Sequence, residues 1–108
     1  PYVWGGTDPN TGADCSGLVQ YVMAHFGIST PRIAQDQYNA SKHLDANEVQ
    51  PGDLVFYSDG YEISHVAIYA GSGLIIHARN SMMGIRIDPI VCGGSIAGYG
   101  TYLSEVER

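Results

Sequence analysis

The stretch Asp14-Cys15-Ser16-Gly17-Leu18-Val19 marks the start of the first predicted helix in this 108-residue chain, and the rest of the fold is placed relative to it. Apolar residues recur from here at helical spacing: Leu18, Val19, Val22, Met23 and Phe26. Asp14 suits the N-cap position, and Gly27 suits the position just after a helix ends. We therefore predict a helix over about residues 15–26, with Cys15 in its first turn.

The position of Cys15 gives it a chemical interpretation. A helix N-terminus carries partial positive charge and unpaired N–H groups. Both favour the thiolate, which is the nucleophilic form of cysteine. Two other interpretations stay open at this point: a buried structural thiol, and a disulfide with Cys92, the second of the chain's two cysteines.

The remaining segments divide the chain into helices followed by strands. Residues 1–13 are rich in glycine and proline and predict irregular backbone, residues 33–41 a short second helix, and residues 42–52 a loop. From Asp53 the period becomes that of strands, which we predict over residues 54–57, 64–70, 74–79, 85–87 and 98–103. Because no helix-length segment separates them, they predict an antiparallel meander. The predicted fold is one α+β domain over residues 1–108, with N-terminal helices packed on a sheet of about five strands.

One hairpin decides whether two of the four histidines can meet. A three-residue loop over residues 71–73 makes paired residue numbers sum to 144, so that His65 and His77 share a face as diagonal neighbours. A two-residue loop would place them on opposite faces. The glycines on both sides of Ser72 favour the longer loop.

Cys15, His65 and His77 together suit two kinds of site. A nucleophilic thiol, a general base and a polar group that orients the base form the usual cysteine-hydrolase set. The same three side chains also suit a zinc site with an open position, although no C-x-x-C or H-E-x-x-H pair is present. His25, near the helix end, and His43, in a loop, are expected to be solvated.

Composition excludes several partners. The formal net charge of −6 argues against a nucleic-acid surface, which needs a basic stripe. No apolar run approaches the roughly 20 residues that cross a bilayer, so no membrane insertion is expected. The chain opens at Pro1 inside a structured-looking segment, so we expect a piece of a longer protein.

Six blocks of sequence together resemble the NlpC/P60 family of papain-like cysteine peptidases, which act on bacterial cell walls. The resemblance covers nearly the whole chain, and the order of the blocks makes it specific. They are PYVWGG from Pro1, DCSGLV from Asp14, Pro31-Arg32 with Gln37, QPGDLVF from Gln50, SHVAIY from Ser64, and Ile76-His77-Ala78.

The resemblance implies a role for each matching residue. Cys15 corresponds to the nucleophile, His65 to the base and His77 to the orienting group. Tyr2 corresponds to a tyrosine beside the catalytic cysteine, and Asp14 and Ser16 to residues that bind the free amino end of a stem peptide. Asp14 also remains the predicted helix cap. No metal or organic cofactor is implied.

The implied reaction is hydrolysis of an amide bond in the peptidoglycan stem peptide, typically that between D-γ-glutamate and a diamino acid. Two alternatives keep the site: an N-acetylmuramoyl-L-alanine amidase and a cross-bridge peptidase. Two others change the class: a non-catalytic wall-binding module, and an intracellular acyltransferase or deamidase. The resemblance further implies a monomeric domain attached to wall-binding or lytic modules, located outside the cell or in its envelope.

Overall fold

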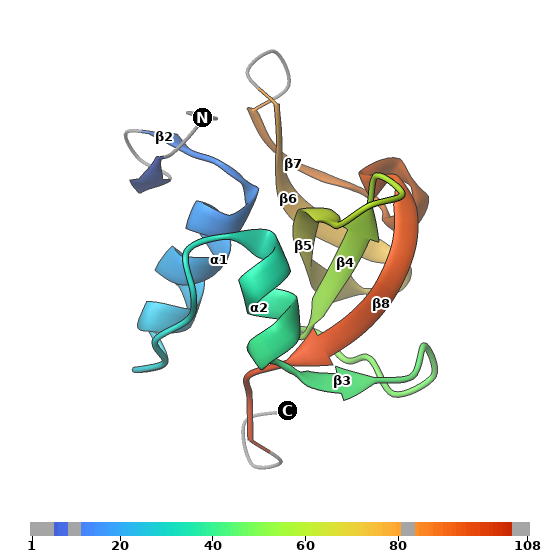
Figure 1. Cartoon of the computed structure of the whole chain (residues 1–108), viewed down its shortest axis with the longest axis horizontal. Helices are drawn as coiled ribbons and strands as arrows, with labels where there is room; N and C mark the ends of the chain where they lie inside the picture. The colour runs from blue at the N-terminus through green and yellow to red at the C-terminus, as the bar shows by residue number, and fades with distance from the viewer. Residues whose placement is uncertain (1–5, 9–11, 81–83, 105–108) are drawn as a thin grey trace.

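Two helices pack on a six-stranded antiparallel sheet, which confirms the predicted α+β class (Figure 1). The structure is a computed structural model that describes residues 6–8, 12–80 and 84–104. Its elements are β1 (Thr7–Asp8), β2 (Gly12–Ala13), α1 (Cys15–Ala24), α2 (Ala34–Ala40), β3 (Lys42–Leu44), β4 (Leu54–Ser58), β5 (Ile63–Gly71), β6 (Leu74–Asn80), β7 (Gly84–Pro89), the 3₁₀ turn η1 (Ile90–Gly93) and β8 (Ser95–Thr101).

Helix α1 forms where the sequence predicts it, with Cys15 as its first residue. The Asp14 carboxylate caps it by accepting a hydrogen bond from the Gly17 N–H at 2.8 Å. The helix ends at Ala24, two residues before the predicted end, because the chain turns over Gly27 at a φ of +73°. There the Ile28 N–H bonds the Met23 carbonyl at 3.0 Å, which closes the helix as a glycine C-cap does.

The sheet departs from the predicted meander at its last strand. Its order is β3-β8-β4-β5-β6-β7, so β4 to β7 follow one another as expected, whereas β8 returns to pair with β4. Strand β3 lies in the segment predicted to be a loop and pairs with β8 at the sheet edge. With three residues, it has too short a pattern to be recognised without that partner.

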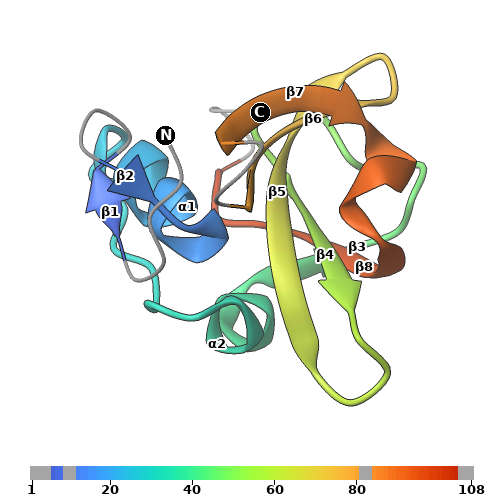
Figure 2. The same ribbon diagram turned by 90° about the horizontal axis from the view of Figure 1, so that it is seen from above.

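Both faces of the central strands are buried, which explains the continuous apolar run of β4. One face packs against the helices through residues of both layers, namely Leu18, Val19, Met23, Leu54, Phe56, Val66 and Ile68. The opposite face carries Val55, Tyr57, Ala67 and Ile75, and Ile90 of η1 packs against them. Figure 2 shows η1 (orange turn after β7) on the side of the sheet away from the helices. The Tyr57 hydroxyl donates to the Ile90 carbonyl at 2.7 Å. Through η1 the chain passes from β7 into β8, which pairs with β4.

The β5–β6 hairpin reaches the predicted register by a different route. Gly71 pairs with Leu74, so the loop is the two residues Ser72 and Gly73, both with positive φ, and the predicted three-residue loop is wrong. A β-bulge at Ala70 inserts one extra residue into β5 and restores the sum of 144 at the pairs beyond it. The predicted common face for His65 and His77 is therefore correct.

The N-terminal segment holds a short ladder where irregular backbone was predicted. Strands β1 and β2 pair beside α1 (Figure 2). The Asp14 N–H bonds the Gly6 carbonyl at 3.0 Å, which brings this segment against the first turn of the helix. The close approach needs Gly17, because a Cβ there would collide with the Gly6 carbonyl oxygen and lie 2.9 Å from Asp14 Oδ1.

We predict that Gly17→Ala lowers the free energy of unfolding by about 1–3 kcal/mol, because the added methyl group overpacks this junction. Helix propensity alone predicts the opposite sign, a gain of about 1 kcal/mol. Urea denaturation measures the change, with Ala24→Gly at the exposed end of α1 as the reference for propensity. A Gly17→Ala protein more stable than wild type would contradict the packing argument.

Candidate active site

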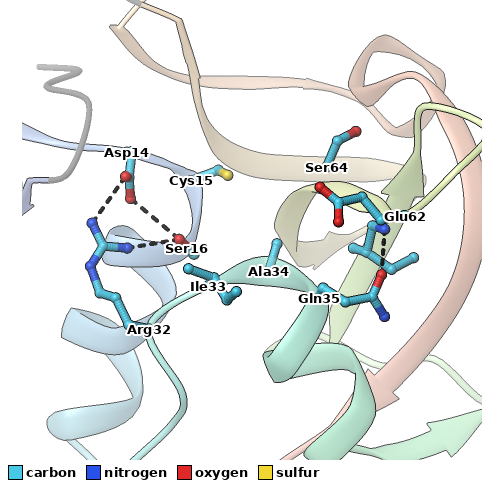
Figure 3. Close-up of a pocket in the computed structure, with 10 residues that line it drawn as sticks. Asp14, Cys15, Ser16, Arg32, Ile33, Ala34, Gln35, Glu62 and Ser64 are labelled. Atoms are coloured by element: carbon cyan, nitrogen blue, oxygen red, sulfur yellow. Dashed lines mark hydrogen bonds and ion pairs between the residues drawn. The ribbon is translucent and has the colours of Figure 1, made fainter.

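Cys15 opens onto a pocket of about 560 Å³ between α1, the start of α2 and β5. Figure 3 shows its sulfur pointing from the end of α1 toward the β5 side of the pocket. Three short segments line the pocket: Asp14, Cys15 and Ser16; Arg32, Ile33, Ala34 and Gln35; and Glu62, Ile63 and Ser64. The predicted nucleophile is thus half-buried, at a helix N-terminus and next to an open volume.

Asp14, Ser16 and Arg32 form one polar network at the α1 side of the pocket (Figure 3). The Arg32 guanidinium donates to Asp14 Oδ2 at 2.9 Å and to the Ser16 hydroxyl at 2.8 Å. Asp14 therefore caps the helix with one oxygen and pairs with Arg32 through the other. No role was predicted for Arg32, because nothing local in the sequence places it opposite Asp14.

Gln37 holds the second helix to the start of the first. Its fully buried side-chain amide donates to the Ser16 carbonyl at 3.0 Å and to the Pro31 carbonyl at 2.8 Å. These bonds fix the backbone directly after Cys15. Gln37 matched a block of the family resemblance, but its role depends on a contact 21 residues away in sequence.

The two predicted histidines are in direct contact, and a third residue extends them into a chain. His65 Nε2 lies 2.8 Å from His77 Nδ1, and His77 Nε2 lies 2.9 Å from Asp88 Oδ2. His77 is fully buried and Asp88 nearly so. Asp88 was not among the predicted site residues. Its place follows from the β6–β7 register, in which His77 pairs with Arg86, so that Asp88 is a diagonal neighbour on the same face.

Cys15 lies next to the strand that carries His65. It lines the same pocket as Ser64, the residue before His65, and the backbone N–H of Val66, the residue after it, favours the thiolate. His65 itself lies on the sheet face that carries Tyr57 and His77, with ring-centroid distances of 5.6 and 5.0 Å. The structure thus brings His65 and His77 into direct contact and places Cys15 beside the neighbouring residues of β5.

Burial controls the protonation of the Cys15 thiol and of the His65 ring. It raises the pKa of the Cys15 thiol, and the nearby Asp14 carboxylate acts in the same direction, while the backbone N–H of Val66 opposes them. Burial lowers the pKa of His65 to about 4, and the neighbouring His77 ring and Arg79 guanidinium act in the same direction. The expectation that the helix terminus makes the thiolate the favoured form is corrected, because desolvation outweighs it. The resting pair is a thiol and a neutral imidazole.

The other predicted residues have varied outcomes. Tyr2 lies outside the described residues. Cys15 and Cys92 are both free thiols, so the disulfide interpretation is wrong. His25 and His43 are exposed, as expected. Among residues 6–8, 12–80 and 84–104, no group of three or more His, Cys, Asp or Glu side chains is arranged to hold a metal ion.

No helix in the described part of the chain is both long enough and apolar enough to cross a membrane.

The fold and this site define an α+β domain built around a cysteine at a helix terminus. The model of the NlpC/P60 family matches residues 1–96, and the chain belongs to that family.

Individual relatives agree with this assignment. The chain is 46% identical to the bifunctional muramidase/DL-endopeptidase CwlT of Bacillus subtilis over 96 residues, which are 86% of this chain and 29% of that protein. It is 46% identical to a gamma-DL-glutamyl hydrolase of the same organism over 84 residues, 75% of this chain and 20% of that protein. A crystal structure of an NlpC/P60 family protein from Bacillus cereus matches with a TM-score of 0.90 at 33% identity, covering 96% of this chain and 36% of that one. The chain thus spans less than a third of the length of these two curated relatives.

We predict that the protein loses stability as the pH falls from about 6.5 to about 4. His65 stays neutral in the folded protein over this range, whereas the same ring binds a proton in the unfolded chain. Acid therefore lowers the free energy of unfolding by up to about 3 kcal/mol. Thermal unfolding at constant ionic strength measures this loss in wild type and in His65→Gln. The variant should lose less stability over the same range. Parallel curves for the two proteins would show that His65 is not the cause of the loss.

We also predict that alkylation of Cys15 by iodoacetamide has its half-maximal rate above the pH of about 8.5 found for a free thiol, since burial disfavours the reactive thiolate. A Cys92→Ser background isolates the Cys15 signal, and intact-mass spectrometry follows the labelling. A midpoint well below 8.5 would instead indicate a thiolate–imidazolium pair.

Proposed function

We propose that this domain is a cysteine endopeptidase that hydrolyses the amide bond between D-γ-glutamate and the diamino acid of a peptidoglycan stem peptide. The observation that carries the proposal is the helix-terminal Cys15 on an open pocket whose lining includes Ser64, next to the His65 that contacts His77. Relatives named as a DL-endopeptidase and a gamma-DL-glutamyl hydrolase support the choice of bond.

The chemistry follows from the protonation states of the site. The Cys15 sulfur attacks the amide carbonyl while its proton passes to the neutral imidazole of His65. N–H groups at the start of α1 stabilise the oxyanion of the tetrahedral intermediate. His65 then gives the proton to the leaving amine, and water hydrolyses the resulting thioester. His77 holds the His65 ring in the orientation that both transfers need.

The polar network beside Cys15 supports recognition of the substrate's amino end. Asp14 and Ser16 line the pocket next to the thiol, and Arg32 offsets the charge of the carboxylate. We propose that a stem-peptide ammonium binds at Asp14 and Ser16, with Tyr2 as the third contact. The substrate then competes with Arg32 for the carboxylate, so binding is expected to displace or share that ion pair.

The fraction of each relative that the chain matches supports a modular role. It spans 29% of the muramidase/DL-endopeptidase and 20% of the gamma-DL-glutamyl hydrolase. We propose that residues 1–108 act as one catalytic module of a longer protein that works in the cell envelope or outside the cell, without a metal or organic cofactor.

Digestion of purified muropeptides followed by mass spectrometry tests the proposal. Wild type should release fragments with a new free amine on the diamino acid, and Cys15→Ala should release none. Cys92→Ala is the matched control and should keep wild-type activity, because Cys92 lies outside the pocket lining.

Other products would overturn the proposed bond. A new amine on L-alanine would indicate the amidase, and a cut between stem peptides the cross-bridge peptidase. Wall binding without any cleavage by wild type would indicate a non-catalytic module.

A further inference from the structure

The buried carboxylate of Asp88 is hydrogen-bonded to His77, on the side of that ring away from His65, and the reaction proposed above does not use it. Asp88 lies on β7, one of the two edge strands of the sheet, with its side chain turned inward and 11% exposed. Burial of a carboxylate is costly unless its hydrogen bonds and charge are satisfied. Here His77 satisfies one oxygen directly, and two guanidinium groups lie nearby, Arg79 at 3.6 Å and Arg86 at 3.7 Å.

The geometry points to Asp88 as a positioning residue that selects the ring tautomers of His77 and His65. This inference concerns how the site is held and rests on the proposed function only for its kinetic consequences.

The position of each ring hydrogen follows from the contact before it. An ionised carboxylate accepts hydrogen bonds and donates none, so the hydrogen of His77 lies on Nε2, facing Asp88 Oδ2. With one hydrogen on each ring, His77 Nδ1 is an acceptor, and His65 must donate to it from Nε2. The Nδ1 of His65 is then free of hydrogen and is the nitrogen left to accept the thiol proton.

The charges around Asp88 keep it in the accepting form. Its bond from His77 lowers the pKa of the Asp88 carboxyl despite its partial burial, and the guanidinium groups of Arg86 and Arg79 act in the same direction. Arg79 extends from β6 and Arg86 from β7, so the carboxylate is flanked on both strands. A protonated Asp88 could donate to His77 and reverse the whole chain of tautomers.

Nitrogen-15 NMR of the histidine rings tests the tautomers in wild type without any substrate. We expect both His65 and His77 to carry their hydrogen on Nε2 near neutral pH. A hydrogen on Nδ1 of either ring, whether alone or in a doubly protonated ring, would overturn the inference even if no variant folds.

Asp88→Asn tests the consequence for catalysis on the same muropeptides. The amide keeps the shape of the carboxylate but also presents a donor, so we expect kcat to fall about 10- to 100-fold with KM changed less than twofold. Asp53→Asn is the matched control, because Asp53 is also buried but accepts its hydrogen bond from the Gln50 N–H. Thermal unfolding of both variants separates loss of fold from loss of orientation.

The outcomes distinguish this inference from the proposed function. A folded Asp88→Asn protein with kcat within twofold of wild type, or with a loss equal to that of Asp53→Asn, would overturn the positioning role. If wild type cleaves no wall peptide, the proposed function fails, while the ring tautomers still decide the role of Asp88.

Discussion

The capping of α1 by Asp14 is the interaction on which the rest of the site depends. One carboxylate oxygen accepts from the Gly17 N–H and the other from Arg32, so a single side chain joins the helix start to the segment that leads into α2. Gln37 strengthens the same junction by bonding the Ser16 carbonyl. Because the cap sets the first helical residue, it also sets where the Cys15 thiol points.

Desolvation, rather than the helix dipole, sets the resting chemistry of the site. The helix N-terminus favours a charged thiolate, but burial of Cys15 acts more strongly in the other direction. Burial likewise keeps His65 neutral. In the reaction proposed above, a neutral thiol and imidazole rely on orientation, because the proton must move during attack. The hydrogen-bonded series His65, His77 and Asp88 is the proposed source of that orientation.

Local sequence patterns predicted the elements that carry their own signals. The cap at Asp14, the apolar stripe of α1 and the four-strand run from β4 to β7 all follow from neighbouring residues. The shared face of His65 and His77 was predicted from hairpin parity, although a two-residue loop with a bulge at Ala70 produces it. Strand β3 and the return of β8 to β4 were missed, since each depends on a partner far away in sequence.

The sequence by itself determined the helix that presents Cys15 and the α+β class, and it supplied Cys15, His65 and His77 as the proposed catalytic residues. Periodicity, capping and turn chemistry act over a few residues, so they can be recognised in a single chain. The tertiary structure decided the partners of these residues: Arg32 at Asp14, Gln37 at the Ser16 backbone and Asp88 behind His77. It also decided their protonation, because burial is a property of the whole packed domain and of no local stretch.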